Sequence, residues 1–243
     1  MSKGHFKKSH FAKKIYIIFL ISAENVLKKS EKLFIICFGI INYLFIEVNM
    51  KNRKLHKVFK RMPTLTTERL VLRPMSTSDA WDMYEYAHRE DVTEFLLWSP
   101  HPSVSYTRDY LAYIESRYAA CEFYDWAITL ADSGKMIGTA GFTKINTDHN
   151  VGEIGYVLSP EYHGKGLGFE AARRVVDFGF EQLELHRIEA KFMQGNAASL
   201  HVMEKLGMTF EGYQRDSMLV KGKYRTIGYC SILADEYSSH KNH

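Results

Sequence analysis

The sequence predicts a mixed α/β (α+β) fold in which helices flank a single twisted, mostly antiparallel sheet. Three features indicate it: short strands of alternating polarity, two amphipathic helices near the start of the domain, and one strand–helix–strand unit in its middle. Strands joined by short turns pair antiparallel, whereas the strand–helix–strand unit makes two strands parallel. We expect the domain to span residues 62–238, between an N-terminal extension of residues 1–61 and a tail of residues 239–243.

The predicted strands rest on alternation and on turn chemistry. Leu70 and Leu72 alternate with other residues in the first strand, so that they share one face. The turn formers D-S-G-K at residues 132–135 join two further strands into a hairpin. Strands are predicted over residues 69–73, 126–130, 136–145, 150–158, 187–193, 209–219 and 224–233.

Four helices are predicted between these strands. The sequence S-T-S-D at residues 76–79 offers a cap for the first helix, which carries Trp81, Tyr84 and His88 at helical spacing. The second helix covers residues 105–122, and we assign its aromatic side chains to core packing rather than to a platform for nucleic-acid bases. These side chains are Tyr106, Tyr110, Tyr113 and Tyr118. The other two helices are predicted over residues 164–183 and 197–206.

Charge is distributed unevenly along the chain. Residues 1–61 contain 14 Lys and Arg against three Asp and Glu, whereas the remainder contains 18 against 25. The basic excess lies outside the predicted domain, so we expect the domain to bind no nucleic acid. An acidic domain suits cationic acceptors through long-range attraction, although surface acidity also serves solubility alone. The three cysteines lie far apart without a C-x-x-C pair, which predicts no disulfide, no metal site and a reduced, cytoplasmic setting.

Four interpretations are open for residues 1–61. The apolar run at residues 33–46 is shorter than the roughly 20 residues that a membrane-spanning helix needs. A basic start before an apolar stretch is typical of a signal peptide, but no small-residue cleavage site follows. Lysines beside apolar residues also suit a membrane-surface anchor. Alternatively translation begins at Met50 or Met62, and we expect membrane contact only if the segment is made.

The most informative motif is H-G-K-G-L-G at residues 163–168, placed between a strand and an amphipathic helix. Glycines let backbone N–H groups turn toward one point, and the N-terminus of a helix favours an anion. We therefore expect a diphosphate to bind there. The loop lacks both the G-K-[ST] of a P-loop and the first glycine of a dinucleotide-binding fingerprint.

With this loop the sequence resembles the GNAT acyltransferase superfamily, whose acetyl-CoA loop reads Gln or Arg, two residues, Gly, one residue, then Gly or Ala. His163 departs from the first position, while Gly166 and Gly168 match. Two further blocks resemble the ribosomal-protein N-terminal acetyltransferase (RimJ/RimL-like) branch: T-E-R-L-V-L-R-P at residues 67–74, and N-A-A-S followed by E-K-L-G-M within residues 196–208. The resemblance implies the GNAT fold, in which the two parallel central strands part in a V-shaped split that takes the pantetheine arm.

The resemblance also implies which residues hold the coenzyme. Backbone groups of the strand that enters the split hydrogen-bond to the pantetheine arm as a short extra strand would. Asn196 and Ser199 contribute from the following helix, where Asn196 also serves as the cap. The full set is Tyr156, Val157, Leu158, His163, Gly164, Lys165, Gly166, Leu167, Gly168, Asn196 and Ser199.

Acetyl transfer to an amine needs a base and a proton donor for the leaving thiolate. Glu153 is the candidate base, with Glu189 in reserve; the structural alternative for Glu153 is an exposed strand carboxylate. The tyrosine that many superfamily members place at the position of Met203 is missing. Ser199 is therefore the candidate donor, because its counterpart in the branch lies near the thiol. The alternatives for this donor are Tyr213 and Tyr224.

These residues predict an acetyl-CoA-dependent N-acetyltransferase that transfers acetyl directly to a primary amine. The branch resemblance implies a protein N-terminal α-amine, whose pKa of about 7.7 to 8 leaves it partly neutral at cellular pH. The acceptor pocket is expected between residues 95–102 and the final hairpin, with Trp98, His101 and Tyr213 in its wall. The alternatives are a small-molecule acceptor, such as a polyamine, an amino acid or an aminoglycoside, and a CoA-binding protein without turnover. Either a monomer or a homodimer is expected.

Overall fold

The computed structural model describes residues 54–241, so the interpretations of the apolar runs before residue 54 lie outside the described residues. Residues 54–59 are helical, and this helix places Phe59 in the main core, where it is 2% exposed. Its ring packs against those of Tyr124, Trp126 and Phe178. Within residues 54–241, no helix combines the length and the apolar character needed to cross a bilayer.

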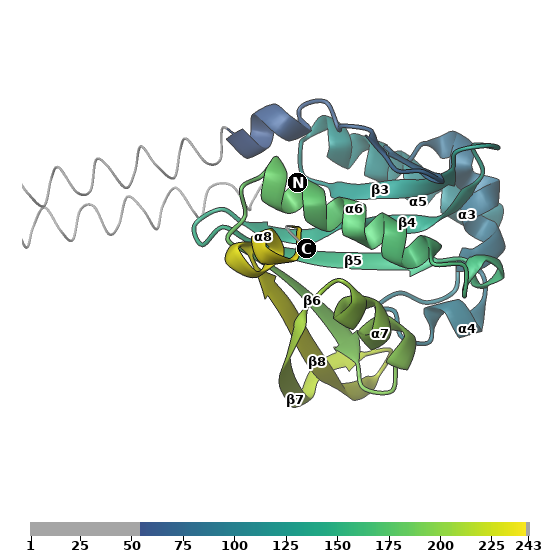
Figure 1. The fold of residues 1–243 in the computed structure, drawn as a ribbon. Helices are drawn as coiled ribbons and strands as arrows, with labels where there is room; N and C mark the ends of the chain where they lie inside the picture. The colour runs from purple at the N-terminus through teal and green to yellow at the C-terminus, as the bar shows by residue number, and fades with distance from the viewer. Residues whose placement is uncertain (1–53, 242–243) are drawn as a thin grey trace, which may run out of the picture. The chain divides into compact units, whose positions relative to one another are not determined.

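One eight-stranded sheet forms the centre of the domain, in the order β1-β2-β3-β4-β5-β6-β8-β7 (Figure 1). All neighbouring strands pair antiparallel except β5 and β6, which are parallel. The predicted fold class is therefore confirmed, and the short β1 is an addition to it. The strands are β1 (Leu65–Thr66), β2 (Leu70–Arg73), β3 (Tyr124–Leu130), β4 (Met136–Asn146), β5 (Val151–Leu158), β6 (Arg187–Met193), β7 (Thr209–Val220) and β8 (Lys223–Leu233).

Helices cover both faces of the sheet. Helix α6 lies across β3, β4 and β5 on one face, where Val175 and Phe178 join the main core (Figure 1). Helices α3 and α5 cover the other face and bury Met83 and Ile114 in a second core. The helical segments are η1 (Thr77–Asp79), α3 (Ala80–Ala87), α4 (Glu90–Thr93), α5 (Val104–Ala119), η2 (Pro160–Tyr162), α6 (Leu167–Glu181), α7 (Ala197–Lys205) and α8 (Ala234–Lys241).

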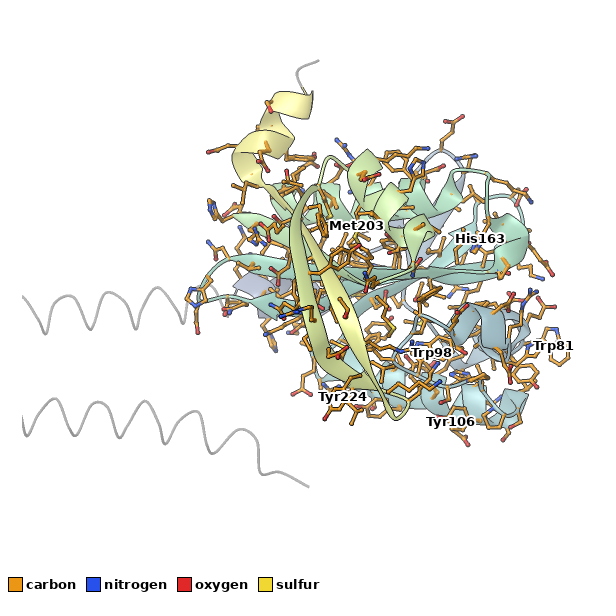
Figure 2. All side chains as sticks on the ribbon, turned by 90° about the horizontal axis from the view of Figure 1, so that it is seen from below. Trp81, Trp98, Tyr106, His163, Met203 and Tyr224 are labelled. Atoms are coloured by element: carbon orange, nitrogen blue, oxygen red, sulfur yellow. The ribbon has the colours of Figure 1, made fainter. Side chains whose placement is uncertain are left out.

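The aromatic residues of the first two long helices do not all pack as their spacing suggested. Trp81 is 62% exposed and projects into solvent at the edge of the molecule (Figure 2). Helix α3 instead buries the face that carries Met83 and Tyr86. In α5, Tyr118 packs against the core as predicted, whereas the prediction of core packing is wrong for two exposed side chains, Tyr106 and Tyr113. Amphipathic spacing identified the helices, but aromatic content did not identify the face that meets the sheet.

The two parallel strands part half-way along their length. Strand β5 pairs with β6 only from Val151 to Ile154, opposite Arg187 to Ala190. Beyond this point β5 stays bonded to β4, and β6 stays bonded to β8. Figure 1 shows β6, β8 and β7 turning away from the other strands. The predicted V-shaped split is thus present, and among the described residues no strand pairs with the backbone edge of residues 155–158 on the β6 side.

Candidate active site

The predicted diphosphate loop follows β5 and ends at the N-terminus of α6. Gly164 and Gly166 have φ angles of +74° and +77°, and Gly166 is the N-cap of α6 without a side-chain cap. The first amides of a helix have no acceptor within that helix, so they are available to an anion. His163 turns back, and its Nε2 lies 3.0 Å from the carbonyl oxygen of Leu158. The contribution of His163 is therefore to join the loop to the end of β5.

Residues from the T-E-R-L block fasten this loop. Arg69 donates from Nε to Glu170 in the first turn of α6, at 2.7 Å, and from Nη1 to the carbonyl of Lys165, at 2.9 Å. The hydroxyl of Thr67 donates to the same Glu170 carboxylate at 2.6 Å. Burial alone would raise the pKa of Glu170, but the hydrogen bonds from Thr67 and Arg69 lower it. The sequence predicted that this block forms a strand, but it did not indicate that Thr67 and Arg69 hold the diphosphate loop in place.

A cavity of about 710 Å³ lies beside the split, on the sheet face that α3 and α5 cover. It brings together most of the predicted catalytic and acceptor residues, from segments far apart in the chain. The predicted residues in its wall are Trp98, His101, Glu153, Tyr156, Val157, Asn196 and Ser199. The diphosphate loop and Leu158 lie outside this wall. In Figure 2 the loop residue His163 and the β7–β8 hairpin residue Tyr224 lie on opposite sides of the view.

Tyr213 differs from the expectation that it lines the acceptor pocket. Its ring packs against Phe192 and Phe210, with centroids 5.9 and 5.0 Å away, and the residue is largely exposed. Strand β7 bulges on either side of Tyr213, between Phe210 and Gly212 and between Gln214 and Met218, which shifts its register against β8. Met218 rather than Tyr213 therefore reaches the cavity from this strand.

Glu153, the candidate base, is held by two partners. Its Oε2 lies 2.5 Å from Nζ of Lys191, and its Oε1 accepts a hydrogen bond from the Thr143 hydroxyl at 3.0 Å. Burial alone would lower the pKa of Lys191, but the hydrogen bond and charge of Glu153 raise it, so the lysine stays cationic. The reserve candidate, Glu189, lies opposite Glu153 on β6 but accepts from Arg187 and is absent from the cavity wall.

Ser199 stands in a short hydrogen-bonded chain at the start of α7. Asn196 caps this helix, because its side-chain oxygen accepts from the amide of Ser199 at 3.1 Å. The phenol of Tyr156 lies 3.1 Å from Oγ of Ser199 and donates to its carbonyl at 3.0 Å. Burial raises the pKa of Tyr156 to about 12, so the phenol keeps its proton at neutral pH. The resemblance implied a role for the Tyr156 backbone alone, whereas the Tyr156 side chain contacts the candidate proton donor Ser199.

The geometry combines an anion-binding loop, an opened parallel strand pair and an acceptor cavity. A family model for the acetyltransferase (GNAT) domain matches residues 69–209. The chain belongs to the GNAT acetyltransferases. GNAT proteins use acetyl-CoA, and the open backbone edge at residues 155–158 together with the glycine loop fits its pantetheine arm and diphosphate.

Individual GNAT relatives agree with this membership. An uncharacterized N-acetyltransferase, p20, from Bacillus licheniformis is 34% identical over 73% of this chain and 99% of its own. The [ribosomal protein uS5]-alanine N-acetyltransferase of Escherichia coli (strain K12) is 29% identical over 66% of this chain and 86% of its own. A crystal structure of a GNAT family acetyltransferase from Bacillus anthracis superposes with a TM-score of 0.64 at 28% identity, covering 71% of this chain and 99% of that one. The chain is thus an N-acetyltransferase.

Several cavity residues escaped the sequence analysis. Asp125 precedes the buried Trp126 on β3, and its carboxylate accepts the amide of Trp126 at 3.0 Å. Burial raises the pKa of the Asp125 carboxyl to about 7, although the hydrogen bonds from Trp126 and Thr139 act to lower it. The sequence signal that could have identified Asp125 is an aspartate next to a tryptophan in an otherwise apolar strand. Other wall residues that were missed are Tyr86, Tyr110, Thr143 and Lys191, whereas Phe95 belongs to the predicted segment.

The predicted pocket residue His101 forms part of an aromatic wall. It is buried, its Nδ1 lies 2.9 Å from the Thr107 hydroxyl, and burial lowers its pKa. The rings of Trp98, Tyr106 and Tyr110 lie 5.0 to 5.6 Å from its ring. His101 is consequently a neutral ring at physiological pH, and its contribution is to shape the cavity wall.

Proposed function

We propose that this GNAT protein transfers the acetyl group of acetyl-CoA directly to a primary amine, with a protein N-terminal α-amine as the acceptor. The observation that carries the proposal is that Glu153 and Ser199 face one cavity beside the split between β5 and β6. The ribosomal-protein acetyltransferase among the relatives supports a protein N-terminus as the acceptor. An α-amine also demands little of a base, because its pKa lies near cellular pH.

Each residue has one part in the proposed transfer. Glu153, directly or through a water molecule, accepts a proton from the amine, whose nitrogen then attacks the carbonyl carbon of the thioester. The new N–C bond forms as the C–S bond breaks, and Ser199 gives its proton to the leaving thiolate. Tyr156 is placed to pass a proton to Ser199 through their 3.1 Å contact and regains its own proton from solvent, to which Glu153 releases the proton it took from the amine. A backbone N–H on the open edge of β5 stabilises the developing charge on the carbonyl oxygen.

A small cationic amine is the second candidate acceptor, because the cavity combines aromatic walls with the Asp125 carboxyl. A thiol-release assay with acetyl-CoA separates the two candidates if it compares peptides bearing free α-amines with small mono- and diamines. Acetylation of the peptide α-amines supports the first acceptor. Turnover confined to small amines overturns it and leaves N-acetyl transfer standing, whereas CoA binding without thiol release from any amine overturns the proposed function as a whole.

A further inference from the structure

We propose that Asp125 is the centre of a second recognition site in the acceptor cavity, which binds a cationic group of the substrate other than the amine that is acetylated. This inference rests on the proposed N-acetyl transfer and specifies its acceptor. The favoured acceptor then carries two cationic groups, as in a small diamine or in a peptide whose first residue is lysine.

Sheet register sets the distance between this site and the split. Asp125 pairs with Gly141 across β3 and β4, and Gly141 pairs with Gly155 across β4 and β5. Two strand spacings place Asp125 about 10 Å from the edge of β5 that borders the split. Gly141, the residue between the two points, has no side chain, whereas the Thr143 side chain lies over Gly155, where a Cβ atom would be 2.9 Å from its Cγ2. A Cβ atom on Gly141 would lie 2.3 Å from Cα of Asp125 and 2.7 Å from its Oδ1, so any other residue would clash with β3 and press on the carboxylate.

A buried hydroxyl without a partner among the described residues belongs to the wall of the same cavity. Tyr86 belongs to the cavity wall and is 1% exposed, and its hydroxyl has no hydrogen-bond partner among the described residues. Buried polar groups are nearly always hydrogen-bonded, so such an atom indicates a bound group that completes it. Burial raises the pKa of the Tyr86 phenol well above its ordinary value, and the charge of Asp125 adds to this.

The surroundings of Asp125 suit a cation supplied by the substrate. Among the described residues no lysine or arginine forms an ion pair with Asp125, and Lys191 is held by Glu153. Aromatic faces attract cations, and Trp98 and Tyr110 contribute such faces to the wall. The titratable groups around the carboxyl come from α3, α5, the loop between α4 and α5, and the split strands. They are Tyr86, Tyr110, Tyr118, His101, Glu153 and Lys191.

The test compares two acceptors that differ by one charge, 1,4-diaminobutane and n-butylamine. We expect the wild-type chain to favour the diamine in kcat/KM by tenfold or more, mainly through a lower KM. Asp125→Asn should reduce this preference to about twofold or less, whereas Asp132→Asn, an exposed carboxylate on the turn of the same hairpin, should keep it. The diamine KM should also fall between pH 6 and pH 8 in the wild type, as Asp125 ionises, and this fall should be absent in Asp125→Asn.

Tyr86→Phe provides a second, independent variant. Its hydroxyl has no partner within the described residues, so the change should raise the diamine KM several-fold without lowering the melting temperature. A second comparison uses peptides that begin with lysine or with methionine. A preference for the lysine peptide, without a preference for the diamine over n-butylamine, identifies a protein as the source of the second charge. Equal kcat/KM for the diamine and n-butylamine, together with no preference among the peptides, overturns the inference while N-acetyl transfer stands. Absence of thiol release with every amine overturns the proposed function, and the inference with it.

Discussion

Two carboxyl groups on one face of the sheet are placed in different electrostatic surroundings. Glu153 is paired with Lys191 and bonded to Thr143, so its charge is compensated inside the protein. Asp125 accepts one backbone amide, and burial raises its pKa to about 7. Glu153 is thus held beside the split by partners within the protein, whereas the carboxylate of Asp125 is free to meet a charge from the substrate.

The raised pKa of Asp125 makes folding stability depend on pH. The folded chain holds a proton on this carboxyl up to about pH 7, whereas the unfolded chain releases it near pH 4, so its ionisation destabilises the fold as pH rises between these values. We therefore expect Asp125→Asn to raise the melting temperature relative to wild type at pH 8. The increase should shrink toward zero at pH 5, since both side chains are then neutral. Thermal unfolding followed by circular dichroism at the two pH values measures it, and an equal effect at both would contradict the assignment.

Removing the candidate donor should slow the chemical step. Ser199→Ala is expected to lower kcat by about 10²-fold, which is the lower end of what general acid–base groups contribute. Glu153→Gln should lower kcat by a similar factor, with less effect on the KM for acetyl-CoA. Single-turnover thiol release measures both changes. Ser133→Ala, on an exposed turn, is the matched control, and rates within a few-fold of wild type for Ser199→Ala and Glu153→Gln would refute these roles.

At the scale of elements, the diphosphate loop depends on a segment about one hundred residues earlier in the chain. Arg69 and Thr67 fix Glu170, and Arg69 also holds the carbonyl of Lys165. Glu170 would otherwise place an uncompensated negative charge at the helix end that receives the diphosphate. The arginine thus balances this charge and orients the loop by the same contacts.

Alanine at Gly166 should weaken coenzyme binding. A left-handed backbone conformation costs a residue with a Cβ roughly 1 to 2 kcal/mol, so the loop in Gly166→Ala relaxes away from its binding geometry. The expected result is a rise of about tenfold in the acetyl-CoA KM, or in the Kd measured by calorimetry. Gly222→Ala is the control, because Gly222 has a similar φ of +75° in the β7–β8 turn. It should lower stability without changing acetyl-CoA affinity.

Local patterns made the elements predictable but left the acceptor site hidden. The strand predicted over residues 187–193 has the same bounds as β6, because polarity alternates clearly there. The glycine loop was predictable because its residues are contiguous in sequence. Asp125 and Tyr86 come from β3 and α3, and only the pairing of β3, β4 and β5 brings them to the cavity. Helix α8 also escaped prediction, because its residues are largely polar and the ring of Tyr237 stacking on Phe180 fixes it.

At the scale of the whole molecule, the packed core reaches beyond the predicted start of the domain at Met62. Phe59→Ala should lower the free energy of unfolding by about 3 kcal/mol or more, because a buried ring among three others is lost. His56→Ala, on the exposed side of the same short helix, should change it by less than about 0.5 kcal/mol. Urea unfolding measures both. A chain that begins at Lys51 should likewise be more stable than one that begins at Met62, and equal stabilities would show that Phe59 adds nothing.

The parting of β5 and β6 also bears on how long the protein survives between turnovers. Residues 155–158 present backbone donors and acceptors along an edge that no strand within residues 54–241 covers, and such edges invite association with other extended chains. A molecule that occupies the gap in the folded state alone shifts the folding equilibrium in proportion to the logarithm of its concentration. We therefore expect the metabolic supply of acetyl-CoA to set the resistance of this enzyme to proteases and to aggregation, so that donor starvation shortens its half-life as well as halting its catalysis.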